Sequence, residues 1–147
     1  AQPLTEKNVK VKLSDVSVKD WKTVGMPAEA ANAIDGDPQT VWTAKALTPL
    51  VVDMGKASEV IGFSYAPAQK EDLTGTIYKY NFYVSIDGKN WTKCDASGEF
   101  SNIMHNPVPY FVRFGKKYPA RYFKLEPAAE INNKPATTVG EVGILLK

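Results

Sequence analysis

Alternating apolar side chains constrain the fold of this chain more than any other feature. In residues 76–86 they recur largely at every second position, the period of a strand with one buried face. Asp87-Gly88 follows and predicts a hairpin, with Trp91 opening the return strand. Further strands are predicted at 21–25, 50–55, 60–65, 110–114, 121–125 and 139–146, and a single helical turn within 26–33, while residues 41–43 are a short apolar run. Short strands separated by turn residues indicate an all-β sandwich or barrel.

The size and charge of the chain narrow its class. Its 147 residues, 44% hydrophobic and 23% charged, suit one domain with one core. The net charge of +2 is too small and too scattered to indicate a nucleic-acid groove or a membrane surface, and no apolar run is long enough for a transmembrane segment. Residues 1–15 are polar and predict a tether or an edge strand near 9–13, so the domain proper is expected at 16–147.

Most catalytic schemes lack the residues they need. The chain has one cysteine, Cys94, and one histidine, His105, so no internal disulfide forms and no cluster has the spacing of a zinc site. No Gly-x-Ser-x-Gly elbow and no glycine-rich phosphate loop is present. Cys94 is interpreted as a small buried apolar residue. We therefore expect a domain that is not an enzyme.

The segment from Asn32 to Trp42 gathers oxygen donors on a turn. Asp35 and Asp37 flank a glycine, and Thr40 adds a hydroxyl. Carboxylate, carbonyl and hydroxyl oxygens on a sharp turn suit a hard cation such as Ca²⁺. The same residue types also form ordinary solvated turns, so both interpretations stay open at this point. The spacing is not that of an EF-hand, and a partner carboxylate from elsewhere in the chain would be needed.

Four segments in order resemble one family. They are residues 31–42, 52–56, 80–91 and 120–125, with Glu141 where the closing acidic strand of that family begins. Together they resemble the discoidin or coagulation factor V/VIII type C domain, whose relatives in bacterial glycosidases are the family 32 carbohydrate-binding modules. The resemblance covers roughly residues 20–147. It implies an eight-stranded jelly-roll β-sandwich.

The resemblance also implies a structural Ca²⁺. The implied ligands are the carbonyls of Asn32, Asp37 and Gly140, the side chain of Asp35, the carbonyl and hydroxyl of Thr40, and the carboxylate of Glu141. Glu141 would supply the partner carboxylate that the turn itself lacks. Such an ion would join the early turn to the last strand and stabilise the fold without taking part in chemistry.

The sugar-binding residues of the galactose-binding relatives are not matched. Thr43, Ala68 and Ala136 stand where those relatives carry a histidine, an arginine and an aromatic residue. Tyr65 and Tyr78 are candidate platforms for a sugar ring, although each also fits a strand packed on a sheet. Polar candidates remain in the loops expected at that end: Thr43, Lys45, Gln69, Asp72, Asn132 and Asn133.

By this resemblance the sequence predicts a non-catalytic module that binds a glycan weakly and targets a covalently attached, secreted, periplasmic or cell-surface bacterial enzyme. A glycoside hydrolase acting on hexosamine- or fucose-containing glycans is the expected parent. One alternative is a structural spacer or docking domain without sugar binding. A second is an adhesion domain with exposed apolar loop residues, for which Met26 and Leu47 are the candidates. An enzyme would need His105 in a pocket beside an acidic residue.

Overall fold

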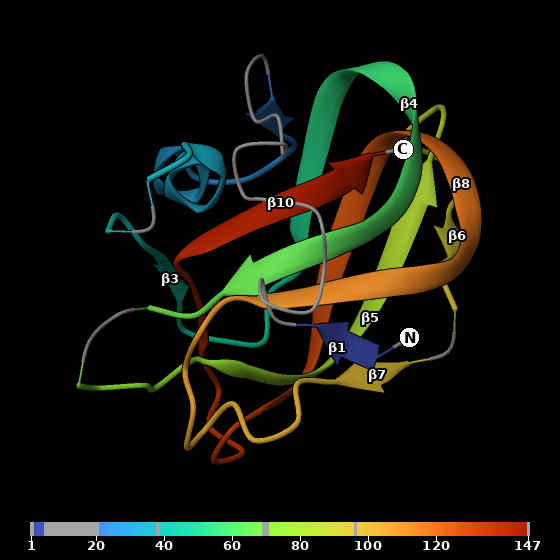
Figure 1. The fold of residues 1–147 in the computed structure, drawn as a ribbon. Helices are drawn as coiled ribbons and strands as arrows, with labels where there is room; N and C mark the ends of the chain where they lie inside the picture. The colour runs from blue at the N-terminus through green and yellow to red at the C-terminus, as the bar shows by residue number, and fades with distance from the viewer. Residues whose placement is uncertain (1, 5–20, 38, 69–70, 96, 147) are drawn as a thin grey trace.

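The computed structural model describes residues 2–4, 21–37, 39–68, 71–95 and 97–146, and it confirms the predicted all-β sandwich (Figure 1). The strands are β1 (Gln2–Leu4), β2 (Lys22–Thr23), β3 (Trp42–Ala44), β4 (Leu50–Ala66), β5 (Ile77–Ser85), β6 (Thr92–Lys93), β7 (Gly98–Glu99), β8 (Tyr110–Glu130), β9 (Thr137–Val139) and β10 (Glu141–Leu146). The predicted helical turn is the 3-10 helix η2 (Ala28–Ile34). The predicted strand near 9–13 lies outside the described residues. No described helix reaches the length and apolarity needed to cross a membrane.

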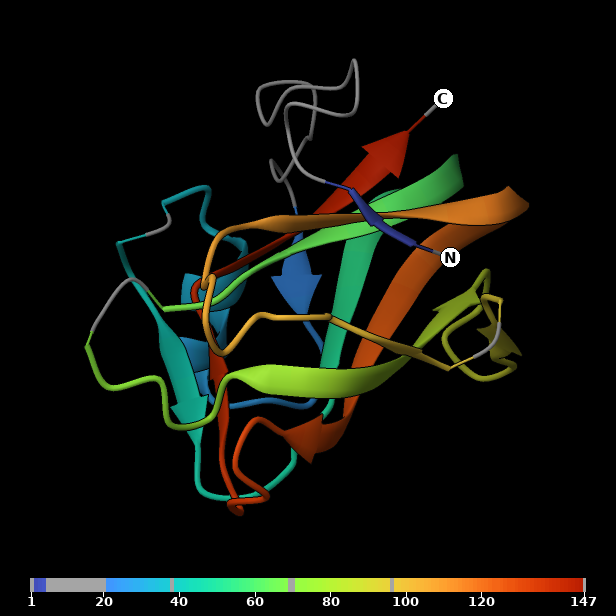
Figure 2. The ribbon, with the colours of Figure 1, turned by 60° about the horizontal axis from the view of Figure 1, so that its bottom comes forward.

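Two long strands, β4 and β8, build both layers of the sandwich. In one layer Leu50–Asp53 of β4 pairs with Tyr122–Leu125 of β8, which continues onto β5. In the other layer Gly62–Tyr65 of β4 pairs with the start of β8 and with β10. Figure 2 shows β4 and β8 turning from one layer into the other. The two layers therefore share their central strands.

This continuity corrects the predicted strand count. The predicted strands at 50–55 and 60–65 are one strand, β4, and those at 110–114 and 121–125 are one strand, β8. Pairing between them continues around the corner, where Ser58 faces Ala120 and Val60 faces Tyr118. The side chains of residues 55–57 are exposed there, so the apolar alternation stops although the strand does not.

Aromatic side chains fill the space between the layers. The rings of Phe63 and Phe82 stack with centroids 4.3 Å apart, and Phe82 also stacks on Phe123 at 5.6 Å. All three are at most 1% exposed. Their burial against the other apolar core residues contributes to the stability of the sandwich. The predicted hairpin after β5 is confirmed by the pairing of Val84 with Thr92.

The short pair β3–β9 closes one end of the sandwich. Trp42 faces Val139, and both are buried against the core. The described parts of three loops meet beside this pair: 45–49 after β3, 67–68 and 71–76 after β4, and 131–136 after β8. Thr138 donates its N–H to Gly75 O at 2.8 Å, and Ile131 donates to Thr76 O at 3.1 Å. This end of the molecule therefore carries both candidate sites.

Candidate functional site

Apolar anchors place the acidic turn beside the last strand. Ala30, Ala33 and Ile34 of η2 are buried in the core, and the helix ends at Asp35. Because η2 packs against β10, the turn after η2 lies beside Glu141. The two are more than a hundred residues apart in the sequence. The N–H of Gly36 donates to Glu141 Oε2 at 3.0 Å. The partner carboxylate that the turn requires is thus in place.

The Thr40 hydroxyl lies within hydrogen-bond distance of three acceptor oxygens, although it can donate only one hydrogen bond. Thr40 Oγ1 lies 3.3 Å from Asn32 O, 2.9 Å from Asp37 O and 2.5 Å from Asp35 Oδ2. A hydroxyl donates one hydrogen bond, so two of these three acceptors are left without that proton. We call Asn32, Asp35, Asp37, Thr40 and Glu141 the oxygen cluster.

Glu141 adds a buried carboxyl group to the oxygen cluster. Its Oε1 atom is buried and has no hydrogen-bond partner among the described residues. Burial raises the pKa of Glu141 to about 8. The negative charges of Asp35 and Asp37 raise it further, whereas the hydrogen bond from the Gly36 N–H lowers it. The protein alone therefore does not satisfy this carboxyl group in its charged form.

The side-chain roles within the turn match both interpretations made from the sequence. Asp35 Oδ1 accepts the N–H of Asp37, and Asp37 Oδ1 accepts that of Gln39, each at 2.9 Å, as in an ordinary Asx turn. The side-chain amide of Asn32 donates to Val41 O at 3.0 Å. The backbone carbonyl of Asn32 faces the Thr40 hydroxyl. Among the described residues, no three His, Cys, Asp or Glu side chains form a metal-binding group. Any cation held here would depend on carbonyl and hydroxyl oxygens as well.

Gly140, the sixth predicted metal ligand, is fixed by close backbone contacts. Its N–H donates to Ala66 O at 2.8 Å. A Cβ atom at this position would lie 2.8 Å from Pro67 O and 2.9 Å from Ala66 O. The position therefore requires glycine, and it sets the path of the chain into β10 directly before Glu141.

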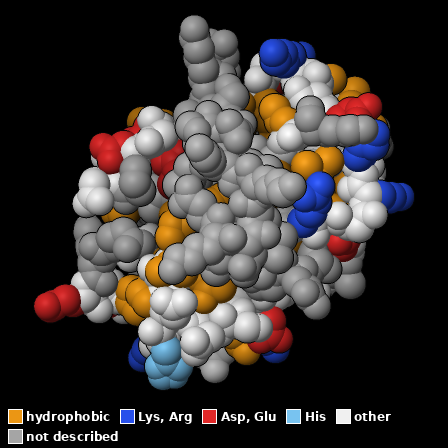
Figure 3. Space-filling model, in the orientation of Figure 1, with side chains coloured by type: hydrophobic (Ala, Val, Ile, Leu, Met, Phe, Trp, Pro, Cys, Tyr) orange, Lys and Arg blue, Asp and Glu red, His pale blue; other side chains and the backbone are white. Residues whose placement is uncertain are grey.

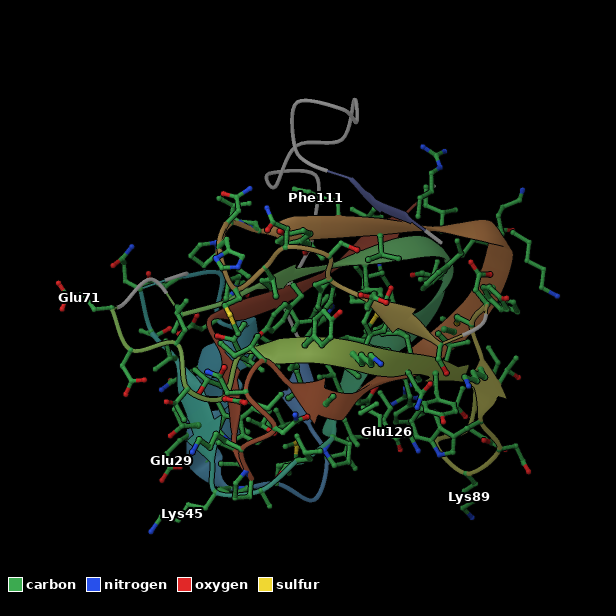
Figure 4. All side chains as sticks on the ribbon, turned by 90° about the horizontal axis from the view of Figure 1, so that it is seen from below. Glu29, Lys45, Glu71, Lys89, Phe111 and Glu126 are labelled. Atoms are coloured by element: carbon green, nitrogen blue, oxygen red, sulfur yellow. The ribbon has the colours of Figure 1, made fainter. Side chains whose placement is uncertain are left out.

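The predicted ligand-binding loops converge, and their side chains point to solvent. Thr43 pairs with Thr138 across β3–β9, and the Ala46 carbonyl accepts the hydroxyl of Thr137 at 2.8 Å. Asp72 Oδ1 accepts the N–H of Thr74 at 2.9 Å. Figure 4 shows Lys45 extending away from the domain. Gln69 lies outside the described residues, and the five described candidates are all exposed: Thr43, Lys45, Asp72, Asn132 and Asn133.

The two tyrosines considered as platforms for a sugar ring differ in their exposure. Tyr65 is fully buried, and its hydroxyl donates to Thr138 O at 2.8 Å and accepts the N–H of Ile77 at 3.0 Å. Burial raises the pKa of Tyr65 far above its usual value. Tyr65 is therefore a structural residue, and its interpretation as a platform is wrong. Tyr78 is half-buried and lines a surface cavity.

This cavity, which we call the Tyr78 cavity, has a volume of about 310 Å³. Its lining residues come from β5, the turn before β8 and the loop after β8: Tyr78, Asn102, Ile103, Met104, His105 and Ile131. Figure 3 shows the single histidine, in pale blue, on the surface of the domain. None of the five described loop candidates lines it, so sequence reasoning missed Asn102 and Met104. A signal existed in Asn102, since a left-handed turn favours asparagine.

Other sequence interpretations are resolved by burial. Cys94 is 3% exposed, and burial raises its pKa to about 12, so it is the small buried residue that was predicted. His105 lines the Tyr78 cavity, but no described Asp or Glu side chain does. Met26 packs against the core and its sulfur accepts the N–H of Val51, whereas Leu47 is 42% exposed. Met26 is therefore not the exposed apolar residue that an adhesion surface requires.

Comparison with known proteins places the fold. The F5/8 type C domain family model matches residues 12–142. The galactose oxidase of Gibberella zeae is 29% identical over an alignment of 143 positions, and the match covers 89% of this chain and 20% of that protein. A structure of a Bacteroides ovatus protein, assigned as an alpha-L-fucosidase, is 34% identical with a TM-score of 0.70, covering all of this chain and 22% of that one. The chain thus spans about a fifth of the length of these relatives.

A carbohydrate-binding module has the same fold. The fifth family 32 module of a Clostridium perfringens family 89 glycoside hydrolase, solved with GalNAc-β-1,3-galactose, is 22% identical with a TM-score of 0.74. The match covers 87% of this chain and 96% of that module. Family model and fold agree over nearly the whole chain. The chain therefore belongs to the F5/8 type C domain family and has the β-sandwich fold of a family 32 carbohydrate-binding module.

Proposed function

We propose that this domain binds a glycan and targets a covalently attached glycoside hydrolase to it. The observation that carries the proposal is the match over the whole sandwich to F5/8 type C domains, together with a module of this fold solved on GalNAc-β-1,3-galactose. The loop-bearing end of the sandwich, with its exposed polar side chains, supports it. Hydroxyl-rich ligands are recognised by such polar groups beside an apolar surface.

The relatives support the role in targeting. Both longer relatives carry a segment like this chain as about a fifth of their length, and both are named for activity on sugars. A weakly binding module tethered to a catalytic domain raises the effective concentration of that domain at its substrate. A secreted, periplasmic or cell-surface location in a bacterium follows from this role, because glycan polymers are met outside the cell.

We further propose that the oxygen cluster holds a structural Ca²⁺. The buried Oε1 of Glu141 lacks a partner, and three acceptors compete for one hydroxyl proton at Thr40. A hard cation stabilises such a group of oxygens, because it needs no donor protons. The proposed ligands are the six residues named from the sequence: Asn32, Asp35, Asp37, Thr40, Gly140 and Glu141. The ion would neutralise the carboxylates and fasten the turn after η2 to β10.

A thermal-shift experiment tests the ion. At a Ca²⁺ concentration about a hundredfold above Kd, the gain in stability is about 2.7 kcal/mol. For a domain of this size that raises Tm by about 5–10 °C over the value in EDTA. Asp35→Ala and Glu141→Ala should each abolish the response to Ca²⁺. If both variants keep the Ca²⁺ response of the wild type, the metal assignment is wrong.

A sugar screen under the same conditions tests glycan binding. The domain, at fixed Ca²⁺, is titrated with neutral and acidic mono- and oligosaccharides while Tm is followed. A shift with one sugar class supports the module and identifies its target. Stabilisation by Ca²⁺ without a response to any sugar would instead support the spacer role.

One observation favours that alternative role as a spacer. Ala68, at the position of the arginine in the galactose-binding relatives, is 2% exposed and cannot contact a ligand. Thr43 and Ala136 likewise lack the imidazole and the ring that those positions carry in the relatives. A spacer would bury part of this surface against its neighbouring domain.

A further inference from the structure

We propose that the Tyr78 cavity is the sugar-binding site of this domain, and that it takes one neutral hexose or N-acetylhexosamine ring. This inference rests on the proposed glycan-binding function and locates it at residues not matched to the ligand residues of the family. Its volume of about 310 Å³ lies at the small end of ligand pockets, which span about 300–1,000 Å³. A cavity of this size suits a single ring better than a longer chain.

The apolar part of the cavity is suited to the C–H face of a sugar. Tyr78 and Ile131 are half-buried, and Met104 is 38% exposed. These side chains come from three different segments, so they form walls and not a single stripe. Burial of a sugar C–H face or an acetamido methyl group against an aromatic ring and a thioether is favourable.

The polar part of the cavity offers unused hydrogen-bonding groups. The side chains of Asn102 and His105 have no hydrogen-bond partner among the described residues. Each can donate and accept, as vicinal sugar hydroxyls require. The Tyr78 hydroxyl donates to Glu99 Oε2 at 2.6 Å, and this hydrogen bond raises the pKa of Tyr78. Its oxygen is therefore free to accept a hydrogen bond from a ligand.

The charge around the cavity favours a neutral ligand. No described Asp, Glu, Lys or Arg side chain lines it. The Glu99 carboxylate accepts a hydrogen bond from the Tyr78 hydroxyl, and Lys79 Nζ lies 5.8 Å from the centroid of the Tyr78 ring. These two neighbours have opposite charges and offer no fixed counter-charge to a carboxylate. Uronic and sialic acids should therefore bind more weakly than neutral sugars.

The walls of the cavity are held in place by the fold. Phe100 donates its N–H to Tyr78 O at 2.8 Å, which ties the turn before β8 to β5. Within that turn the N–H groups of His105 and Asn106 donate to Asn102 O at 3.1 and 2.9 Å. The side chain of Ile103, 1% exposed, anchors the turn in the core. A preformed cavity limits the entropy lost on binding.

The outer face of the β5–β8 pair is a weaker candidate for a sugar platform. Tyr83 and Trp91 are half-buried there, but Lys124 Nζ lies 4.7 Å from the centroid of each ring. Arg121 lies similarly over Tyr122, at 5.3 Å. The cations lie closer to these rings than Lys79 lies to Tyr78, and none of the three rings lines the Tyr78 cavity.

Two asparagine variants provide a matched test. Asn102 and Asn133 both have positive φ, 65° and 60°, so glycine fits either backbone without strain. Only Asn102 lines the cavity, whereas Asn133 belongs to the loop predicted from the sequence. Binding of GalNAc-β-1,3-galactose, galactose, N-acetylglucosamine, fucose and galacturonic acid is measured by isothermal titration. Loss of one or two hydrogen bonds should weaken neutral-sugar binding about tenfold in Asn102→Gly and in His105→Ala.

The outcomes separate this inference from the proposed function. Weakened binding by the two cavity variants supports the site, and Asn133→Gly shows whether the loop predicted from the sequence also contacts the sugar. Weakened binding by Asn133→Gly with unchanged cavity variants overturns the site but leaves glycan binding intact. Absence of binding to every sugar overturns both. Because His105 is the single histidine, its imidazole proton resonances give a second readout, and they should shift on titration with the sugar that binds.

Discussion

Glu130 is a buried acidic residue that holds two loops together. It is 2% exposed, and its Oε2 accepts the N–H of Gly75 at 2.8 Å. Its Oε1 accepts the N–H groups of Asn132 at 2.5 Å and Lys134 at 3.0 Å. One side chain therefore fixes both the loop before β5 and the loop after β8, next to the Tyr78 cavity.

Removal of this carboxyl group should destabilise the domain. Glu130→Ala leaves the N–H of buried Gly75 without an acceptor, so we expect a loss of about 2–4 kcal/mol in the free energy of unfolding. Glu126→Ala is the matched control, because Glu126 is half-buried and accepts only side-chain donors on the sheet surface. Urea unfolding of both variants measures the difference. Equal losses would show that the loop contacts of Glu130 add nothing.

The raised pKa of Glu141 predicts an unusual pH dependence without metal. A carboxyl group whose pKa is raised by folding contributes stability that is present below its unfolded pKa and lost as the pH rises through its folded value, here about 8. In EDTA, the Tm of the wild type should fall between about pH 5 and pH 9, and more steeply than that of Glu141→Gln. Parallel curves for the two proteins would contradict this assignment of the titrating group.

The residues of the oxygen cluster could be predicted from residue types and their order in the sequence. Which other side chains are buried could not. Asp35, Thr40 and Glu141 were identified through a family pattern, and the structure brings them together. The roles of Tyr65 and Glu130 depend on which loops surround them, and those loops are far away in the sequence. Asn102 and His105 form a cavity wall only because Ile103 between them is drawn into the core.

At the scale of elements, apolar periodicity located the strands but not their continuity. The alternation in β4 and β8 stops where each strand crosses the edge of the sandwich and loses its buried face. A strand that bends around a corner is held by backbone pairing, which leaves no mark on side-chain type. The hairpin after β5 was predictable because its turn chemistry is local: Asp87 Oδ1 accepts the N–H groups of Lys89 and Asn90 at 2.8 Å.

The pairing of β4 with β8 leaves no room for a side chain at Gly62. A Cβ atom there would lie 2.2 Å from Val112 O, so Gly62→Ala must push the strands apart. We expect a loss of about 3 kcal/mol or more. Gly115→Ala is the control, since the nearest atom to its Cβ is Asp95 Oδ1 at 3.9 Å, and it should change stability by less than about 1 kcal/mol. A Gly62→Ala variant that melts like the wild type would contradict the described packing.

At the scale of the whole molecule, the proposed ligand sites occupy one end of the sandwich. A tandem repeat of the domain, joined by a flexible linker, should therefore bind a glycan-coated surface about a hundredfold more tightly than the single domain. Its affinity per site for the soluble sugar should stay the same, because the linker changes no contact. Surface plasmon resonance and titration calorimetry measure the two values. Equal surface affinities for single and tandem forms would count against binding through an outward-facing site.

The shared central strands also determine how this domain must fold. Tyr65 faces Tyr110, so even the shortest-range pairing of β4 with β8 closes a loop of more than forty residues before either layer exists. Closing such a loop costs chain entropy that no local contact returns, which makes the nucleation step slow. Once that pairing forms, both layers have a template for their remaining strands. Partially folded forms with one finished layer should therefore not accumulate, and the chain should pass from disorder to order in a single cooperative step.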